Sequence, residues 1–130
     1  MKSDQGTIAP LIASYLALIL LAIIGSTAVV MALVAANRVQ GVSEMAILYA
    51  HDRAVVAGIP DSDELRIQAG IFLSTAPSAQ KLELVQFDTR VQADRSTIRL
   101  CARYRNPLGI GVDSAIICRE ANAKSFLIER

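Results

Sequence analysis

Few residue types that perform chemistry are present, and their pattern argues against a catalytic or metal site. His51 is the single histidine, and Cys101 and Cys118 are the only cysteines. A zinc site needs three or four ligands at suitable spacings, which this set does not supply. We therefore expect a protein that is not an enzyme and holds no cofactor, with His51 as an ordinary surface or packing residue.

A basic stripe is the second candidate for chemistry. Arg99, Arg103 and Arg105 share one face of a predicted strand, and such a stripe can bind phosphate. The aromatic residues near enough to stack on bases, Tyr104 and Phe87, fall on the opposite face. The whole chain has 13 basic and 12 acidic residues, for a formal net charge of +1. We expect a solvated, partly neutralised face and no nucleic-acid partner.

The two cysteines have a structural interpretation as opposed residues of a hairpin. Placing Cys101 opposite Cys118 also places Arg99 opposite Glu120, and the same register sets apolar residues against apolar residues. Directly opposed residues have Cα atoms about 4.5–5.5 Å apart, which is within disulfide reach. A disulfide would place the domain in an oxidising compartment. Two unpaired thiols in a cytosolic domain are the alternative.

The elements around these residues begin with an uncharged apolar run from Ile8 to Ala36. A hydrocarbon core of ~30 Å needs about 20 apolar residues in a helix, and this run is longer. We expect a transmembrane helix over residues 7–36, after a short polar leader over residues 1–6. A cleaved signal peptide is the alternative, but its apolar region is usually only about 7–15 residues long.

The helix is expected to continue beyond the membrane as an amphipathic extension over residues 37–57. Apolar residues recur there at three- and four-residue steps on one face: Val42, Met45, Ala46 and Tyr49. Gly58 and Pro60 are suited to end such a helix.

Residues 58–130 predict a small extracytoplasmic α+β domain. Asp61 or Ser62 can cap a short helix that stops before Pro77. Three alternating segments then predict a three-stranded antiparallel sheet: residues 81–93, 97–105 and 115–123. In the first hairpin, opposing Val91 to Ile98 places the apolar residues of both strands on one side. The expected fold is therefore α+β, with a long N-terminal helix leading into this domain.

A polar head ending in Asp4-Gln5-Gly6 lies directly before the membrane helix, and the extension from Asn37 to Ala54 contains Arg, Gln and Ala. With the short helix and the strands that follow, this layout resembles type IV pilins and pseudopilins. More narrowly, it resembles the TadE-like minor pilins of the tight-adherence (Tad, or Flp) pilus. The resemblance implies cleavage by a prepilin peptidase between Gly6 and Thr7. The stricter pilins have Glu five residues after the cut, where this chain has Leu11.

The resemblance also implies a function, a location and partners. The expected function is that of a non-enzymatic minor pilin or pilus-assembly protein. It would lie in the bacterial cytoplasmic membrane as a single-pass protein, or in a surface filament. Its partners would be the membrane, a prepilin peptidase and other pilin-like subunits. The alternative is a single-span subunit of another cell-envelope complex, with the outer domain as a binding module.

A stripe of small residues offers a surface for the contact with other helices. Small side chains let two membrane helices approach closely. The stripe comprises Ala22, Ser26, Ala32 and Ala36.

Overall fold

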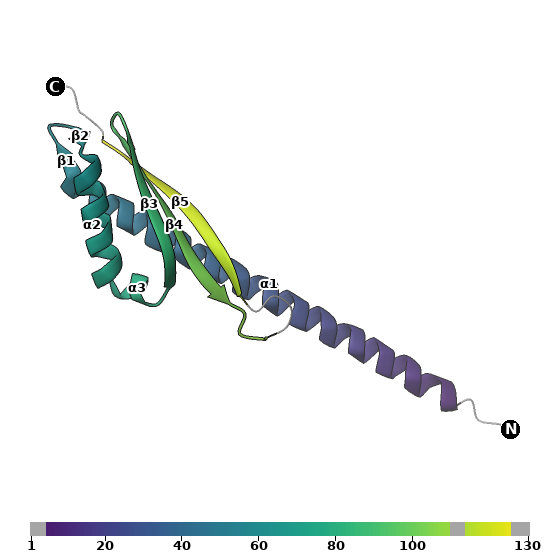
Figure 1. Ribbon diagram of the computed structural model, residues 1–130. Helices are drawn as coiled ribbons and strands as arrows, with labels where there is room; N and C mark the ends of the chain where they lie inside the picture. The colour runs from purple at the N-terminus through teal and green to yellow at the C-terminus, as the bar shows by residue number, and fades with distance from the viewer. Residues whose placement is uncertain (1–4, 110–113, 126–130) are drawn as a thin grey trace. The chain divides into compact units, whose positions relative to one another are not determined.

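The computed structural model describes residues 5–109 and 114–125. Its elements in chain order are α1 (Gln5–Ala54), β1 (Val55–Val56), β2 (Ile59–Pro60), α2 (Ser62–Thr75), α3 (Pro77–Gln80), β3 (Glu83–Gln92), β4 (Arg95–Arg105) and β5 (Ser114–Lys124) (Figure 1). This is the predicted α+β fold, with a long helix, a short helix and a three-stranded antiparallel sheet. The chain divides into two compact units, Met1–Leu33 and Val34–Arg130, and the boundary falls inside α1.

The first unit consists of the first part of α1. Its apolar side chains are exposed on all sides of the helix, as Ile12, Leu18 and Ile24 show. Its hydroxyl groups are bonded within the helix: Ser26 Oγ and Thr27 Oγ1 both donate to the carbonyl of Ile23, at 2.9 and 2.8 Å. A helix that satisfies its own polar groups is suited to lipid, where no water replaces a missing bond.

The second part of α1 differs, because one of its faces is buried. The buried residues of this face are Val39, Val42, Ala46, Ile47, Ala50 and Ala54. Met45, which was predicted on this face, is 46% exposed. The buried face is centred near Ala46 and Ala50, which turns Met45 outward. Tyr49 lies at the margin of this face, where its ring is 5.3 Å from that of Phe72 in α2.

The helix ends at Ala54, three residues before the predicted end. The reason is a small hairpin in which Val56 pairs with Ile59. Its two turn residues, Ala57 and Gly58, have φ of 54° and 83°. Positive φ at both positions is what a two-residue hairpin turn of type I′ requires, and it is incompatible with continuing the helix. The backbone N–H of Asp61 then donates to the carbonyl of Ala54 at 3.0 Å.

Helix α2 begins and ends as the sequence predicts. The Asp61 carboxylate accepts from the backbone N–H groups of Asp63 and Glu64 at 3.0 and 2.9 Å. These are amides that a helix leaves without an internal partner. The helix ends before Pro77, and its buried residues are Leu65, Ala69 and Leu73.

The register predicted for β4 and β5 is confirmed. Cys101 is paired with Cys118, and Arg99 is paired with Glu120. The sheet order is β3-β4-β5, with β4 in the centre.

The register predicted for β3 and β4 is wrong by two residues. Val91 pairs with Ser96, and Ile98 pairs with Thr89. The cause is a tighter turn, because Gln92 pairs directly with Arg95. A shift of two residues keeps each side chain on its predicted face.

One residue of β3 does change face. A bulge falls between Leu84 and Gln86, and a bulge leaves one residue unpaired and re-aims the side chains beside it. Val85, which was predicted on the apolar face, is 46% exposed as a result.

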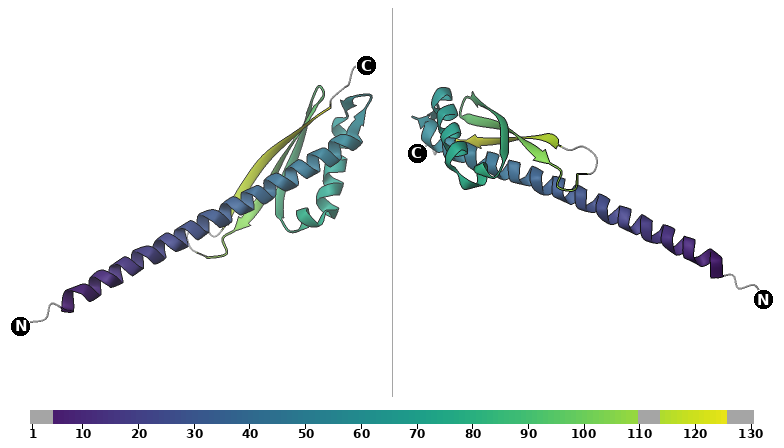
Figure 2. Two further views of the ribbon diagram at one scale, coloured as in Figure 1. Left: turned by 180° about the vertical axis from the view of Figure 1, so that it is seen from behind. Right: turned by 60° about the horizontal axis from the view of Figure 1, so that its bottom comes forward.

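The core of the second unit lies between one face of the sheet and the helices. Ile98, Leu100 and Ala102 of β4 belong to the same buried cluster as the α1 face and the α2 stripe. The second part of α1 and the sheet lie side by side in all three views (Figures 1 and 2). The opposite face of the sheet is exposed and polar apart from the cysteine pair and a few apolar residues.

Candidate functional site

One helix of the described chain is long and apolar enough to cross a membrane. None of its most apolar stretch is buried in the structure. Transfer of such a surface out of water is strongly favourable. A protein surface or a lipid phase must therefore cover the first part of α1.

The small-residue stripe divides between the two units. Ala22 and Ser26 are exposed, and Ala32 is half-buried. Ala36 is only 6% exposed and lies in the second unit. The part of the stripe that remains open to another helix is therefore its N-terminal part.

The predicted processing site lies in the first turn of α1, since the helix begins at Gln5 and includes Gly6 and Thr7. Pro10 then falls inside the helix. Its ring meets the carbonyl of the residue four positions earlier, which here is Gly6. Leu11, at the position of the pilin glutamate, is 70% exposed.

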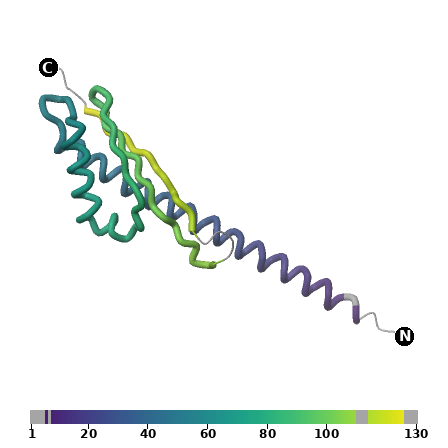
Figure 3. The backbone as a smooth tube through the Cα atoms, viewed as in Figure 1, coloured from purple at the N-terminus to yellow at the C-terminus, as the bar shows by residue number. Residues whose placement is uncertain are grey.

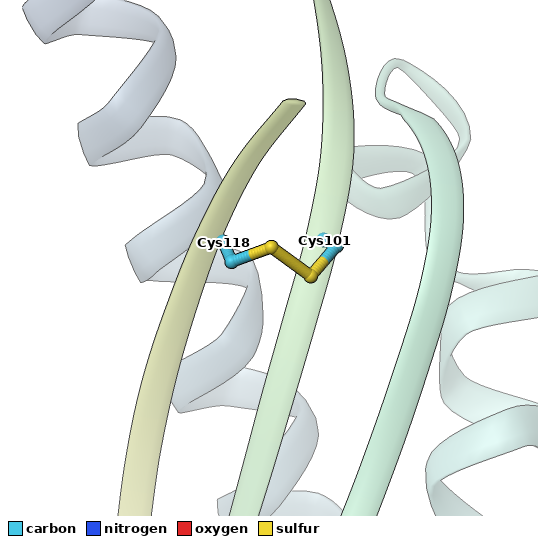
Figure 4. The surroundings of a disulfide bond; sticks show 2 residues. All are labelled: Cys101 and Cys118. Carbon is cyan, nitrogen blue, oxygen red and sulfur yellow. A yellow bond between two sulfur atoms is a disulfide. The ribbon is translucent and has the colours of Figure 1, made fainter. Parts of the chain in front are cut away.

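The cysteine pair forms a disulfide on the outer face of the sheet (Figure 4). The two sulfur atoms are 2.08 Å apart, and the two Cα atoms are 4.1 Å apart. The bond joins the central strand β4 to the edge strand β5. It is flanked by Val85 and Ile116, both of them exposed.

His51 is buried, and both of its ring nitrogens have partners. Nδ1 lies 2.7 Å from Ser96 Oγ, and Nε2 lies 2.9 Å from Ser125 Oγ. The ring therefore links the last turns of α1 to the beginning of β4 and to the residue after β5. The sequence alone predicts an ordinary surface or packing residue at this position. Its partners are 45 and 74 residues away, so no local signal could have identified them.

The positive charges of Arg99, Arg103 and Arg105 on the outer face of the sheet are offset by nearby acidic residues. Arg103 and Arg105 both lie near Glu83, at 3.5 and 3.0 Å. Arg99 is paired in the sheet with Asp88 on one side and Glu120 on the other. Within residues 5–109 and 114–125, no group of three or more His, Cys, Asp or Glu side chains could hold a metal ion.

These features define a class of protein: an α+β domain with a disulfide, following a helix that is able to cross a membrane. Comparison of the chain with family models, with curated proteins and with solved structures finds no match. The functional conclusion therefore rests on the fold, the site and the sequence.

Proposed function

We propose that this chain is a non-enzymatic minor pilin or pilus-assembly protein of a Tad or type IV-like system. The observation behind the proposal is the change of character within α1. This single helix of 50 residues is exposed and apolar on all sides in its first part. In its second part it is buried against a small disulfide-linked sheet. A membrane helix that continues as the core helix of a small domain is the layout of type IV pilins.

The disulfide supports one orientation in the bacterial cytoplasmic membrane. Disulfides persist in oxidising compartments and are rare in the cytosol. With Cys101 bonded to Cys118, the domain after α1 faces the outside of the cytoplasm and the N-terminus faces the cytoplasm.

Pro10 supports processing after Gly6. In the uncut chain, Pro10 lies inside α1, where proline costs about 3 kcal/mol. After the cut, Thr7 is the first residue and Pro10 lies in the first turn, where the backbone N–H has no helical partner in any case. Cleavage would therefore remove a local cost from the helix. Intact-mass measurement of the protein co-expressed with a prepilin peptidase tests this cleavage. We expect the mass to fall by that of residues 1–6.

Association through the helix is the central element of the proposed function. Ala22 and Ser26 leave a shallow surface between larger apolar side chains, and the Ser26 hydroxyl is already bonded to its own helix. Small residues at such an interface allow close packing worth about 1–2 kcal/mol in model membrane helices.

Crosslinking in the membrane tests this association. Ala22→Cys places a thiol on the stripe, and Leu20→Cys places a matched thiol on the opposite face of the same helix. The native cysteines are engaged with each other. We expect crosslinks to pilin-like helices from Ala22→Cys and few from Leu20→Cys. Adding Ser26→Leu, within the open part of the stripe, should weaken them without affecting membrane insertion. Equal crosslinking from both faces, or none from either, would show that α1 is only an anchor.

A further inference from the structure

The two edges of the sheet differ in how open they are to a further strand. β3 is one edge, and its bulge between Leu84 and Gln86 interrupts the ladder, which is a common protection of an exposed edge. β5 is the other edge, and its pairing with β4 runs without a break from Ser114 to Lys124. The tube drawing shows β5 alongside the second part of α1, with β3 on the side of α2 (Figure 3). A long, regular edge such as β5 is a template for another strand.

Alternate residues of β5 direct their backbone N–H and C=O groups away from β4. In an antiparallel pair, opposed residues that do not exchange hydrogen bonds have Cα atoms about 4.5 Å apart, whereas those that do are about 5.5 Å apart. The Cα atoms of Cys101 and Cys118 are 4.1 Å apart, so this pair does not exchange hydrogen bonds. Because the pattern repeats every two residues, the backbone groups of Glu120 and Asn122 also point away from β4. In agreement, the Glu120 carbonyl accepts from Gln40 Nε2 of α1 at 3.5 Å.

Most of these backbone groups are open to a partner. Between described residues, the contact with Gln40 is the only hydrogen bond made to the outward backbone groups of Cys118, Glu120 and Asn122. The three N–H groups and the carbonyls of Cys118 and Asn122 are therefore available to a further strand. In the recognition of an added strand, such main-chain bonds give affinity and the side-chain contacts give specificity.

A groove between α1 and β5 sets the chemistry of the partner. Its apolar lining comes from Ile47, Leu48 and Ala121, of which Leu48 is 61% exposed. Its charged lining comes from Glu44 and Glu120, both of them exposed, and no basic side chain of the described residues lines it. A strand that fits this groove has apolar residues on the side of α1 and basic residues on the side of Glu120.

The neighbouring arginines leave the edge acidic at Glu120. Arg99 is the partner of Glu120 in β4, on the side away from the groove, and it is shared with Asp88 of β3. Arg119 lies on the opposite face of β5 from Glu120, because side chains alternate along a strand.

The same charges disfavour a second copy of the chain as the partner. In an antiparallel pairing of two β5 edges, a register centred on Arg119 or on Glu120 places like charges directly opposite each other, which is destabilising. A register centred on Cys118 places Ile116 opposite Glu120. A strand with basic residues at alternate positions avoids these conflicts and neutralises Glu120.

We propose that the edge of β5 binds an extended segment of another protein in which basic and apolar residues alternate. The segment pairs with the backbone from Cys118 to Asn122, its basic side chains lie beside Glu120, and its apolar side chains lie against Leu48. The site belongs to the second unit alone, so it is independent of whether α1 crosses a membrane and of any role in a pilus.

A labelled peptide in which lysine and valine alternate tests the backbone pairing, with the detergent-solubilised full protein and fluorescence anisotropy as the readout. Asn122→Pro removes one outward N–H and leaves the ladder to β4 intact, since proline is tolerated where the N–H of an edge strand faces solvent. Asn122→Ala is the matched control, because it also loses the bond from Thr97 Oγ1 but keeps the N–H. We expect Asn122→Pro to bind the peptide at least about threefold more weakly than Asn122→Ala, through the lost hydrogen bond.

Two further comparisons test the charge of the partner. A peptide with glutamate in place of lysine should bind the native protein at least about tenfold more weakly, because like charges then oppose at Glu120. Glu120→Lys should weaken binding of the lysine peptide and strengthen binding of the glutamate peptide. Micelles without protein give the background for both peptides.

Each outcome decides for or against this site. Absence of binding to the native protein, or equal affinity of the lysine peptide for the native protein, Asn122→Pro and Glu120→Lys, would overturn the proposal. Circular dichroism checks that Asn122→Pro is folded. If it is not, Glu120→Lys and amide hydrogen exchange decide, since the bound peptide should slow exchange at Cys118, Glu120 and Asn122. Self-association in sedimentation that Asn122→Pro abolishes, without peptide binding, would overturn the basic partner and assign the edge to a second copy.

Discussion

The two parts of α1 are both rich in apolar residues, yet only the second part buries them within the structure. In the first part, Ile24 is 40% exposed, and Leu20, Leu21 and Ile23 beside it are exposed as well. In the second part, Ile47 and Ala50 are fully buried against the sheet and α2. One continuous helix therefore changes along its length from an exposed apolar surface to a packed core element. What changes is whether apolar residues surround the helix or are confined to one of its sides.

The polar groups of the two parts show the same contrast. Ser14, Ser26 and Thr27 bond to carbonyls three or four residues earlier in their own helix. His51 instead bonds to side chains at the start of β4 and after β5. The first part of α1 therefore needs no other element for its hydrogen bonds, whereas the second part depends on the sheet.

The largest expected effect comes from making the same substitution in both parts. Ile47→Ala removes a fully buried side chain and should lower the free energy of unfolding of the domain by about 2–5 kcal/mol, through lost burial and the cavity it leaves. Ile24→Ala, in the exposed part, should leave that free energy unchanged. Urea unfolding of the detergent-solubilised protein, followed by far-UV circular dichroism, measures both. A loss of similar size from the two variants would contradict the division of α1.

The sequence predicts well the regions whose structure follows from residue types and their spacing. The cysteines and the Arg99–Glu120 pair define the register of β4 and β5, and the structure has that register. The apolar run likewise predicts the first part of α1, because length and composition suffice for a membrane helix. The capping residue Asp61 predicts where α2 begins, since its role depends only on the next three residues.

The regions that the sequence misses depend on backbone geometry or on distant contacts. The turn between β3 and β4 has Ala93 at φ of 55°, and the end of α1 has Ala57 at φ of 54°. Alanine gives no sign of such a conformation, unlike glycine, so both turns were misplaced. The bulge at Val85 has no local signal either. The hydrogen-bond partners of His51 are set by the tertiary packing, and no spacing in the sequence indicates them.

A smaller effect is expected from removing the disulfide, which lies in the second unit alone. Replacing both Cys101 and Cys118 by alanine should lower the free energy of unfolding of the domain by roughly 3 kcal/mol in the chain-entropy model, given the loop it closes. Membrane association should be unaffected, because the first part of α1 contains neither cysteine. The same urea titration measures the loss, and carbonate extraction measures the association. Reductant should destabilise the native protein to the same extent and leave the double variant unchanged. An effect of reductant on the double variant would show a cause other than this bond.

The smallest expected effect concerns hydrogen bonds. His51→Phe keeps a ring of similar size but removes both bonds, leaving the buried Ser96 hydroxyl without its 2.7 Å partner. A buried polar group left unpaired costs about 1–3 kcal/mol, so the domain should be destabilised by that amount. Ser26→Ala, the matched change in the first part of α1, removes only a bond to the carbonyl of Ile23, which keeps its place in the helix ladder. It should leave the free energy of unfolding of the domain unchanged. The measurement is again urea unfolding, made at one pH for all variants. If His51→Phe were as neutral as Ser26→Ala, the second part of α1 would be held to the sheet by apolar packing alone. The hydrogen bonds of His51 would then contribute nothing to the free energy of unfolding.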